Sequence, residues 1–267
     1  MSRARALAGR VKRLVRRPPD VPTYRYVFVV TYGRSGSTLV QGLLNTLPRT
    51  LVRGENGFYV LHLFRAWASV RKFRSVHRRH KPRVSHSAFY GLNEVTPASF
   101  VESTRSLVTG HLLGSVPPKQ VDVLGFKEVL WHRVRPTETE GFFDFLDSAF
   151  PGCRFVLNER DHEKVVGSGF WQGHDQDEVL AAIRRVEEIQ GFLRSTRKER
   201  TLDLRYELLT SEDQATSDAQ LRSLAEFVHG SCDDALLAQL RETRKTGHGP
   251  YPFGKSRDRQ ERRAATP

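Results

Sequence analysis

Residues 24–45 read YRYVFVVTYGRSGSTLVQGLLN, an apolar run followed by a turn rich in glycine and serine and then by a helical repeat of apolar residues. The run at 26–30 is almost continuously apolar, which is typical of a parallel strand buried on both faces. The turn needs backbone freedom, which Gly33 and Gly36 supply. Beyond the turn, apolar residues recur at i, i+3 and i+4, so a helix is expected to begin near Ser37.

This order of strand, turn and helix predicts an anion-binding site. The first N–H groups of an α-helix have no partner within the helix, and the helix dipole adds partial positive charge at the same end. A guanidinium in the turn can bind an oxyanion through two parallel N–H groups. We therefore expect a phosphate or sulfate group at the turn formed by Gly33, Arg34, Ser35, Gly36, Ser37 and Thr38.

The turn differs from the loop that binds nucleoside triphosphates in the position of its cation. That loop places Lys directly after the second glycine, before a Ser or Thr that binds Mg²⁺. Here Ser37 follows the second glycine, and the cation is Arg34. A nucleotide-dependent kinase with a P-loop is therefore the weaker interpretation, and we expect a site that contains no metal.

The same residues resemble a known family. The sequence GRSGSTLVQGLLN, followed by a short strand and Glu55, is similar to the 5′-phosphosulfate loop and first active-site segment of sulfotransferases that use 3′-phosphoadenosine 5′-phosphosulfate (PAPS). In that family, an Arg at a strand end and a Ser on the next helix bind the 3′-phosphate. Arg160 and Ser168 match this pair, because CRFVLNERD reads as a strand running into a turn and the two residues have the family's spacing.

Two shorter segments add to the resemblance, which spans about residues 24–210. GFKEVLW at 125–131 is similar to a Gly-x-Lys-Glu strand end of the family, and LDLRYELL at 202–209 is similar to an Arg-Tyr-Glu-x-Leu strand. The resemblance implies a P-loop-like sulfotransferase fold, PAPS as sulfate donor, and an acceptor hydroxyl on a glycan, glycolipid or small metabolite.

The implied reaction needs few catalytic groups. Sulfuryl transfer resembles phosphoryl transfer, in which the protein mainly positions the reactants and neutralises developing charge. Arg34 and Lys127 are the cations expected to do this. A base must also take the acceptor proton, and Glu55 is our candidate, with Glu128 and His132 as alternatives.

The rest of the chain alternates between strand and helix patterns, which predicts an α/β fold with a mostly parallel central sheet and helices on both faces. Ligands in such folds bind at the carboxyl ends of the strands. Strands are expected near 25–31, 50–53, 121–127, 153–159 and 201–206. Helices are expected near 37–46, 57–73, 97–112, 138–149, 161–170, 176–196, 215–229 and 233–242.

The length of 267 residues favours one such domain, at 21–250. Within it, the segment at 71–120 is polar and basic early and contains several prolines, so we expect an acceptor-binding insertion or lid. The flanks at 1–20 and 251–267 are basic tails. Cys153 and Cys232 are too few for a disulfide scaffold and lack the spacing of a metal site.

The formal charge of +13 favours anionic partners of any kind. A non-catalytic polyanion-binding protein is therefore a third interpretation, although no recognised nucleic-acid motif supports it. The N-terminal tail is expected either to be a solvated flank or to lie as a basic amphipathic helix on an anionic membrane. It lacks the apolar core of a signal peptide, and no stretch approaches about 20 apolar residues, so a cytoplasmic protein is expected.

Overall fold

The computed structural model describes residues 24–77, 79, 85–168 and 175–246. Its centre is a five-stranded sheet with the order β2-β3-β1-β4-β5, in which every pair of neighbours is parallel. The strands are β1 (Arg25–Val30), β2 (Thr50–Arg53), β3 (Val123–Glu128), β4 (Arg154–Glu159) and β5 (Thr201–Arg205). The predicted α/β class with a parallel central sheet is confirmed.

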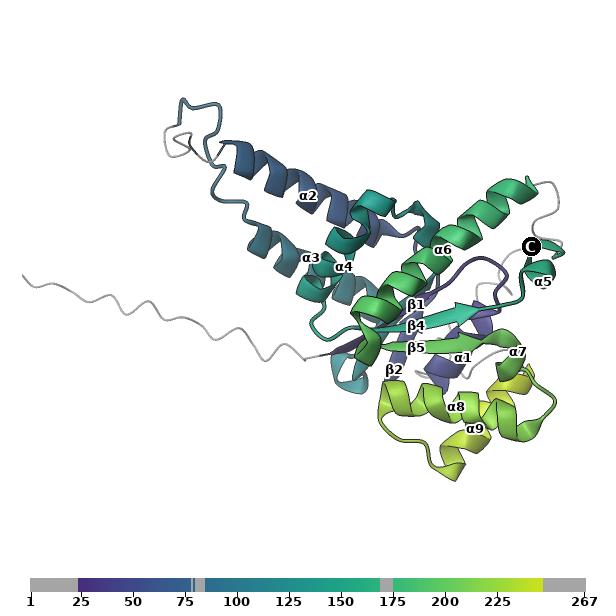
Figure 1. The fold of residues 1–267 in the computed structure, drawn as a ribbon. Helices are drawn as coiled ribbons and strands as arrows, with labels where there is room; N and C mark the ends of the chain where they lie inside the picture. Colours follow the sequence, from purple (N-terminus) through teal and green to yellow (C-terminus); the bar gives the residue numbers. More distant parts are fainter. Residues whose placement is uncertain (1–23, 78, 80–84, 169–174, 247–267) are drawn as a thin grey trace, which may run out of the picture.

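Helices cover both faces of this sheet (Figure 1). One buried cluster joins the sheet to α2 (Tyr59–His77), α3 (Pro97–Leu113), α4 (Thr139–Ala149) and α6 (Gln176–Thr196). The other joins it to α1 (Ser37–Thr46), α8 (Gln214–His229) and α9 (Asp234–Thr246). The short helices α5 (His162–Val166) and α7 (Tyr206–Leu209) follow β4 and β5 at their carboxyl ends.

The alternation of side chains along β1 divides the core between these two clusters. Tyr26, Phe28 and Val30 belong to the first cluster, whereas Val27 and Val29 belong to the second. All five side chains are at most 5% exposed. The apolar run therefore forms a central strand buried on both faces, and its carboxyl end fixes the position of the turn that follows.

The predicted strand boundaries agree with the structure to within two residues. The prediction at 201–206 extends one residue too far, because Tyr206 begins α7. The predicted helix at 161–170 is shorter in the structure, where the backbone N–H of Gly167 caps α5 by donating to Glu163. Residues 169–170 of that prediction lie outside the described residues, as do the predicted basic tails at 1–20 and 251–267.

Part of the segment at 71–120 packs into the core. Helix α3 lies beside α2, and its Val108 and Leu112 are at most 2% exposed within the first cluster. Figure 1 shows that the carboxyl end of α2 points away from the sheet. The single domain at 21–250 and the acceptor-binding role of this segment stay predictions.

Glu138 ties α2 to the chain before α4. Its carboxylate accepts hydrogen bonds from Arg65 at 3.0 and 2.9 Å and from Arg135. Burial by itself would raise the pKa of Glu138, but hydrogen bonds from the two guanidinium groups outweigh burial and lower the pKa from 4.5 to about 2. Since the folded pKa is depressed, the ionised carboxylate stabilises the fold above pH 4.5, and this contribution is lost as the pH falls towards 2.

Candidate active site

A cleft of about 900 Å³ opens at the carboxyl ends of β1, β3 and β4. One side is the glycine-containing turn and the start of α1, and the other is the turn Leu130–Arg133 together with the first part of α6. The sequence-predicted residues that line it are Gly33, Arg34, Gly36, Ser37, Thr38, Glu55, Lys127 and Arg160. Parallel strands thus bring together residues from four separate stretches of sequence.

The glycine turn has the geometry of an anion site. Arg34 and Gly36 have left-handed backbones, with φ of 65° and 81°. Helix α1 begins at Ser37, and within the described residues no side chain caps it and no acidic side chain lies in its first turn. The partial positive charge of the helix end is therefore directed at the cleft without a compensating group on α1.

Ser35 supports this turn from beneath. Its side chain is buried, and its hydroxyl lies 2.6 Å from that of Thr31. The amide of Asn158, on β4, donates to the Ser35 carbonyl at 2.9 Å. The Ser35 carbonyl thus fastens the turn to β4, and the hydroxyl is bonded to Thr31 rather than lining the cleft, so the backbone N–H of Ser35 remains as a candidate to bind a ligand.

Tyr206 packs against the same turn, and the sequence did not identify it as a site residue. A Cβ atom on Gly36 would lie 2.1 Å from Cδ2 of the Tyr206 ring, so only glycine fits. The guanidinium of Arg160 also lies over the Tyr206 ring, 4.4 Å from its centre. Tyr206 falls within the LDLRYELL segment, which was the only signal for it in the sequence.

Arg160 is held in place by the turn itself. Its Nη1 donates to the Arg34 carbonyl at 3.0 Å. The Tyr32 hydroxyl donates to the Arg160 carbonyl at 2.9 Å and accepts from the Arg160 N–H at 2.9 Å. Burial is the main cause that raises the pKa of Tyr32 to about 12, so this hydroxyl stays protonated.

Arg160 and Ser168 each carry a buried polar atom that has no hydrogen-bond partner among the described residues: Nε of Arg160 and Oγ of Ser168. Seven other buried side-chain polar atoms among the described residues also lack a partner, so these two atoms point to a ligand only together with the position of Arg160 in the cleft. Arg160 lines the cleft, whereas Ser168 follows α5 and is not among the lining residues.

Lys127 and Glu55 form an ion pair inside the cleft. Lys127 Nζ lies 2.5 Å from Glu55 Oε1, and the side chains are 6% and 49% exposed, respectively. Lys127 is on β3 beside Val29 of β1, and Glu55 is in the loop after β2. A buried ammonium thus stands opposite the glycine turn with a half-exposed carboxylate bound to it.

Glu128 is wrong as an alternative base. Its side chain is buried, and its carboxylate accepts four backbone hydrogen bonds. Two come from Asn56 and Phe58 at 3.2 and 2.9 Å, and two come from Val129 and Leu130 at 2.8 and 3.2 Å. Glu128 therefore fixes the loop that presents Glu55 and has no free access to the cleft.

His132, the other alternative, does line the cleft. Burial, together with the nearby Arg133, lowers the pKa of His132 below its ordinary 6.5. The imidazole is therefore neutral at pH 7 and able to accept a proton.

Within the described residues, no cluster of three or more His, Cys, Asp and Glu side chains could hold a metal ion. None of the described helices is both long enough and apolar enough to cross a membrane.

Comparison with known proteins gives a family and a fold. A family model described as "Sulfotransferase family" matches residues 26–229. Among solved structures, the chain is similar to the "Sulfotransferase Domain from the Synechococcus PCC 7002 Olefin Synthase", with a TM-score of 0.50 and 16% sequence identity over 91% of this chain and 85% of that one. No curated protein sequence matches the chain significantly.

Proposed function

The chain belongs to the sulfotransferase family, and on this basis we propose that it transfers a sulfuryl group from PAPS to a hydroxyl group of an acceptor. The observation that carries the proposal is the cleft in which the amino end of α1, Arg34, Lys127, Glu55 and Arg160 converge. This set of groups fits an anionic donor on one side and a hydroxylated acceptor on the other.

The glycine turn would hold the 5′-phosphosulfate. The N–H groups of Ser37 and Thr38 lie at an uncapped helix end, and their hydroxyls add two further donors. Arg34 can donate to two oxyanion oxygens at once. These donors are part of the folded turn before any ligand binds, so little rearrangement is needed to stabilise the charge.

Arg160 and Ser168 would bind the 3′-phosphate. Nε of Arg160 and Oγ of Ser168 support this assignment, because both lack a hydrogen-bond partner among the described residues and a phosphate would provide acceptors for them. Tyr206 would act on Arg160 as a positioning residue, since its ring contacts the guanidinium and the glycine turn together.

PAPS supplies an activated sulfuryl group, and the protein has to position it, neutralise charge and remove one proton. The acceptor oxygen forms a bond to sulfur as the bond from sulfur to the phosphate oxygen breaks, which releases 3′,5′-ADP. The ammonium of Lys127 has three N–H groups, so it can donate to the transferred group or the leaving oxygen while it holds Glu55. We propose that Glu55 accepts the hydroxyl proton.

His132 is the second candidate for the base, because it lines the same cleft and its lowered pKa keeps the imidazole neutral at pH 7. For the acceptor we propose only a chemical class, a hydroxylated glycan, glycolipid or small metabolite. Cytoplasmic location and membrane contact through the N-terminal tail stay predictions from sequence.

A thermal-unfolding screen tests the donor. In EDTA, 3′,5′-ADP should raise the unfolding temperature, because a ligand at a hundred times its dissociation constant stabilises the native state by about 2.7 kcal/mol. Under the same conditions, 5′-AMP should have a smaller effect. A shift that requires ATP with Mg²⁺ would support a kinase instead, and a shift with heparin but with no nucleotide would support a polyanion-binding protein.

A further inference from the structure

The carboxyl end of α2 and the turn before α3 carry an unusual group of exposed apolar side chains. Phe73, Val76, Tyr90 and Val95 are 49%, 65%, 63% and 51% exposed. Among the large apolar side chains exposed in the described part of the chain, only two others, Leu107 and Leu208, lie elsewhere. We call the surface formed by Arg71, Lys72, Phe73, Val76, Tyr90 and Val95 the hairpin tip.

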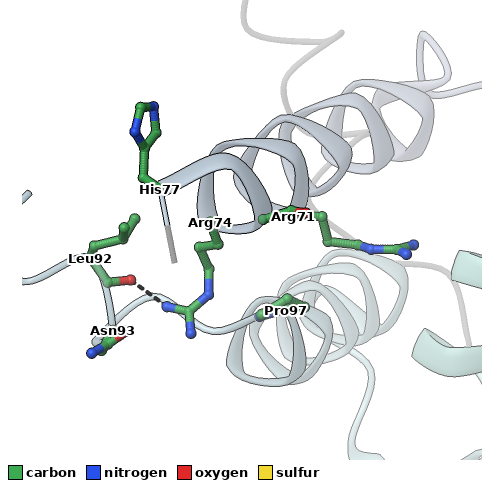
Figure 2. Close-up of a pocket in the computed structure, with 7 residues that line it drawn as sticks. Arg71, Arg74, His77, Leu92, Asn93 and Pro97 are labelled. Atoms are coloured by element: carbon green, nitrogen blue, oxygen red, sulfur yellow. Dashed lines mark hydrogen bonds between the residues drawn. The ribbon is translucent and has the colours of Figure 1, made fainter. Parts of the chain in front are cut away.

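Contacts between the helix and the turn hold the two segments of the hairpin tip together. The Phe89 ring lies 6.1 Å from the ring of Phe73 and 4.4 Å from that of His77, measured between centres. Arg74 donates to the Leu92 carbonyl, as Figure 2 shows, and to the Val95 carbonyl at 3.1 Å. The turn is thereby fastened to the last turns of α2.

The same end of the hairpin has a net positive charge, because its described residues include Arg71, Lys72, Arg74 and Arg79 against one carboxylate, Glu94. Between Glu55 and Glu94 the sequence contains no acidic residue, and α2 has no acidic side chain in its first turn. Arg71 and Lys72 are exposed, and neither forms an ion pair with any described residue. Arg71 lies over the Trp67 ring at 4.6 Å, a contact that leaves its positive charge without a neutralising carboxylate.

A small cavity of about 330 Å³ opens beside Arg71 and is lined by Arg71, Arg74, Ser75, His77, Leu92, Asn93 and Pro97 (Figure 2). Exposed aromatic and aliphatic side chains next to unpaired cations are the composition of surfaces that bind at a lipid headgroup interface. The apolar groups enter the interface and the cations remain beside the phosphates.

We propose that the hairpin tip binds the surface of an anionic phospholipid bilayer. Two other partners fit the surface less well. A polyanion such as heparin would bind the cations but would leave the aliphatic side chains exposed to water. A second copy of the hairpin tip would place like charges beside one another. Helix α2 has 19 residues and is about 28 Å long. It therefore separates the tip from the Glu55 loop, so that lipid binding leaves the cleft open.

Co-sedimentation of the full-length protein with phosphatidylcholine vesicles, with and without phosphatidylserine, tests this proposal. We expect binding only to vesicles that contain phosphatidylserine. The variant Arg71→Gln/Lys72→Gln should bind about 25-fold more weakly at low salt, because each cation near an anionic surface contributes roughly five-fold. Its matched control is Lys119→Gln/Lys198→Gln, which removes the same charge at two exposed positions elsewhere.

The variant Val76→Ser/Tyr90→Ser tests the apolar contribution separately. Both side chains are more than 60% exposed, so the unfolding temperature should not change, whereas vesicle binding should fall by at least about tenfold. If Val76→Ser/Tyr90→Ser binds vesicles as wild type does, or if the Lys119→Gln/Lys198→Gln control loses as much as Arg71→Gln/Lys72→Gln, the proposal is wrong. An equal loss of heparin or single-stranded DNA binding in Val76→Ser/Tyr90→Ser would also overturn it, in favour of a polyanion partner.

Discussion

Removal of the Ser168 hydroxyl is the cleanest perturbation of the proposed 3′-phosphate site. Oγ of Ser168 is buried and has no described partner, so Ser168→Ala breaks no hydrogen bond within the described fold. A hydrogen bond to a charged group contributes about 1.5 to 3 kcal/mol, and a hydroxyl donor is expected near the lower limit. The affinity for 3′,5′-ADP should therefore fall by about tenfold, with almost no change for 5′-AMP.

Arg160→Ala should cost more, because it removes a full charge. It also removes the hydrogen bond to the Arg34 carbonyl and the contact with the Tyr206 ring, so part of its effect passes through the glycine turn. The loss of affinity that passes through the turn should be the same for 5′-AMP as for 3′,5′-ADP. The difference between the two nucleotides, about 1.5 to 3 kcal/mol or 10- to 150-fold in affinity, isolates the 3′-phosphate.

Calorimetric titration of both nucleotides into wild type, the two single variants and the double variant measures these terms. Because both side chains would bind one phosphate, the double variant should deviate from additivity. Ser195→Ala, at an exposed serine of α6, is the control for the loss of a hydroxyl. Equal losses for 3′,5′-ADP and 5′-AMP in Ser168→Ala would refute the reasoning.

Three other changes have defined outcomes. Glu55→Gln should reduce sulfuryl transfer by about 10²- to 10⁴-fold while 3′,5′-ADP affinity is unchanged, and a variant that keeps more than half its rate would contradict Glu55 as the base. Gly36→Ala should lower the free energy of unfolding by more than the control Gly57→Ala does. Both glycines have φ above 70°, but only Gly36 lies against an aromatic ring. Gly36→Ala should also abolish nucleotide binding in titrations. Glu138→Gln should lower the free energy of unfolding at pH 7 by about 1 to 2 kcal/mol. The fall of the Glu138 pKa from 4.5 to about 2 corresponds to about 3 kcal/mol of stabilisation, and solvent screening of Arg65, whose side chain is 35% exposed, reduces this value. Urea unfolding should show wild type losing this advantage between pH 4.5 and 2, and a constant difference across that range would count against the ion pair.

Local sequence was sufficient to predict the elements around the anion site. The apolar run, the two glycines and the helical repeat depend only on neighbouring residues, and the predicted helix at 37–46 has the bounds of α1. The convergence of Arg34, Lys127 and Arg160 was also predictable, because each follows or ends a strand of one parallel sheet and such strand ends share an edge.

Other features of the site depend on contacts that the sequence does not contain. Glu55 and Glu128 were both candidates for the base, and the choice between them requires the position of the loop after β2, whose N–H groups bind the Glu128 carboxylate. Tyr206 meets Gly36 only because β5 lies beside β4 at the edge of the sheet. The inward position of the Ser35 hydroxyl depends on Thr31, and the Ser35 carbonyl accepts from Asn158 on β4, so the sequence alone does not show how the turn is fastened to the sheet.

A crystal structure of the protein with 3′,5′-ADP, grown in EDTA, tests the central claim most directly. We expect the 5′-phosphate to lie within about 3.2 Å of the N–H groups of Ser37 and Thr38, and the 3′-phosphate to lie at the same distance from Arg160 Nε and Ser168 Oγ. A nucleotide bound outside this cleft, or bound in it with the 3′-phosphate away from Arg160, would contradict the claim that this sulfotransferase-family chain uses PAPS as its donor.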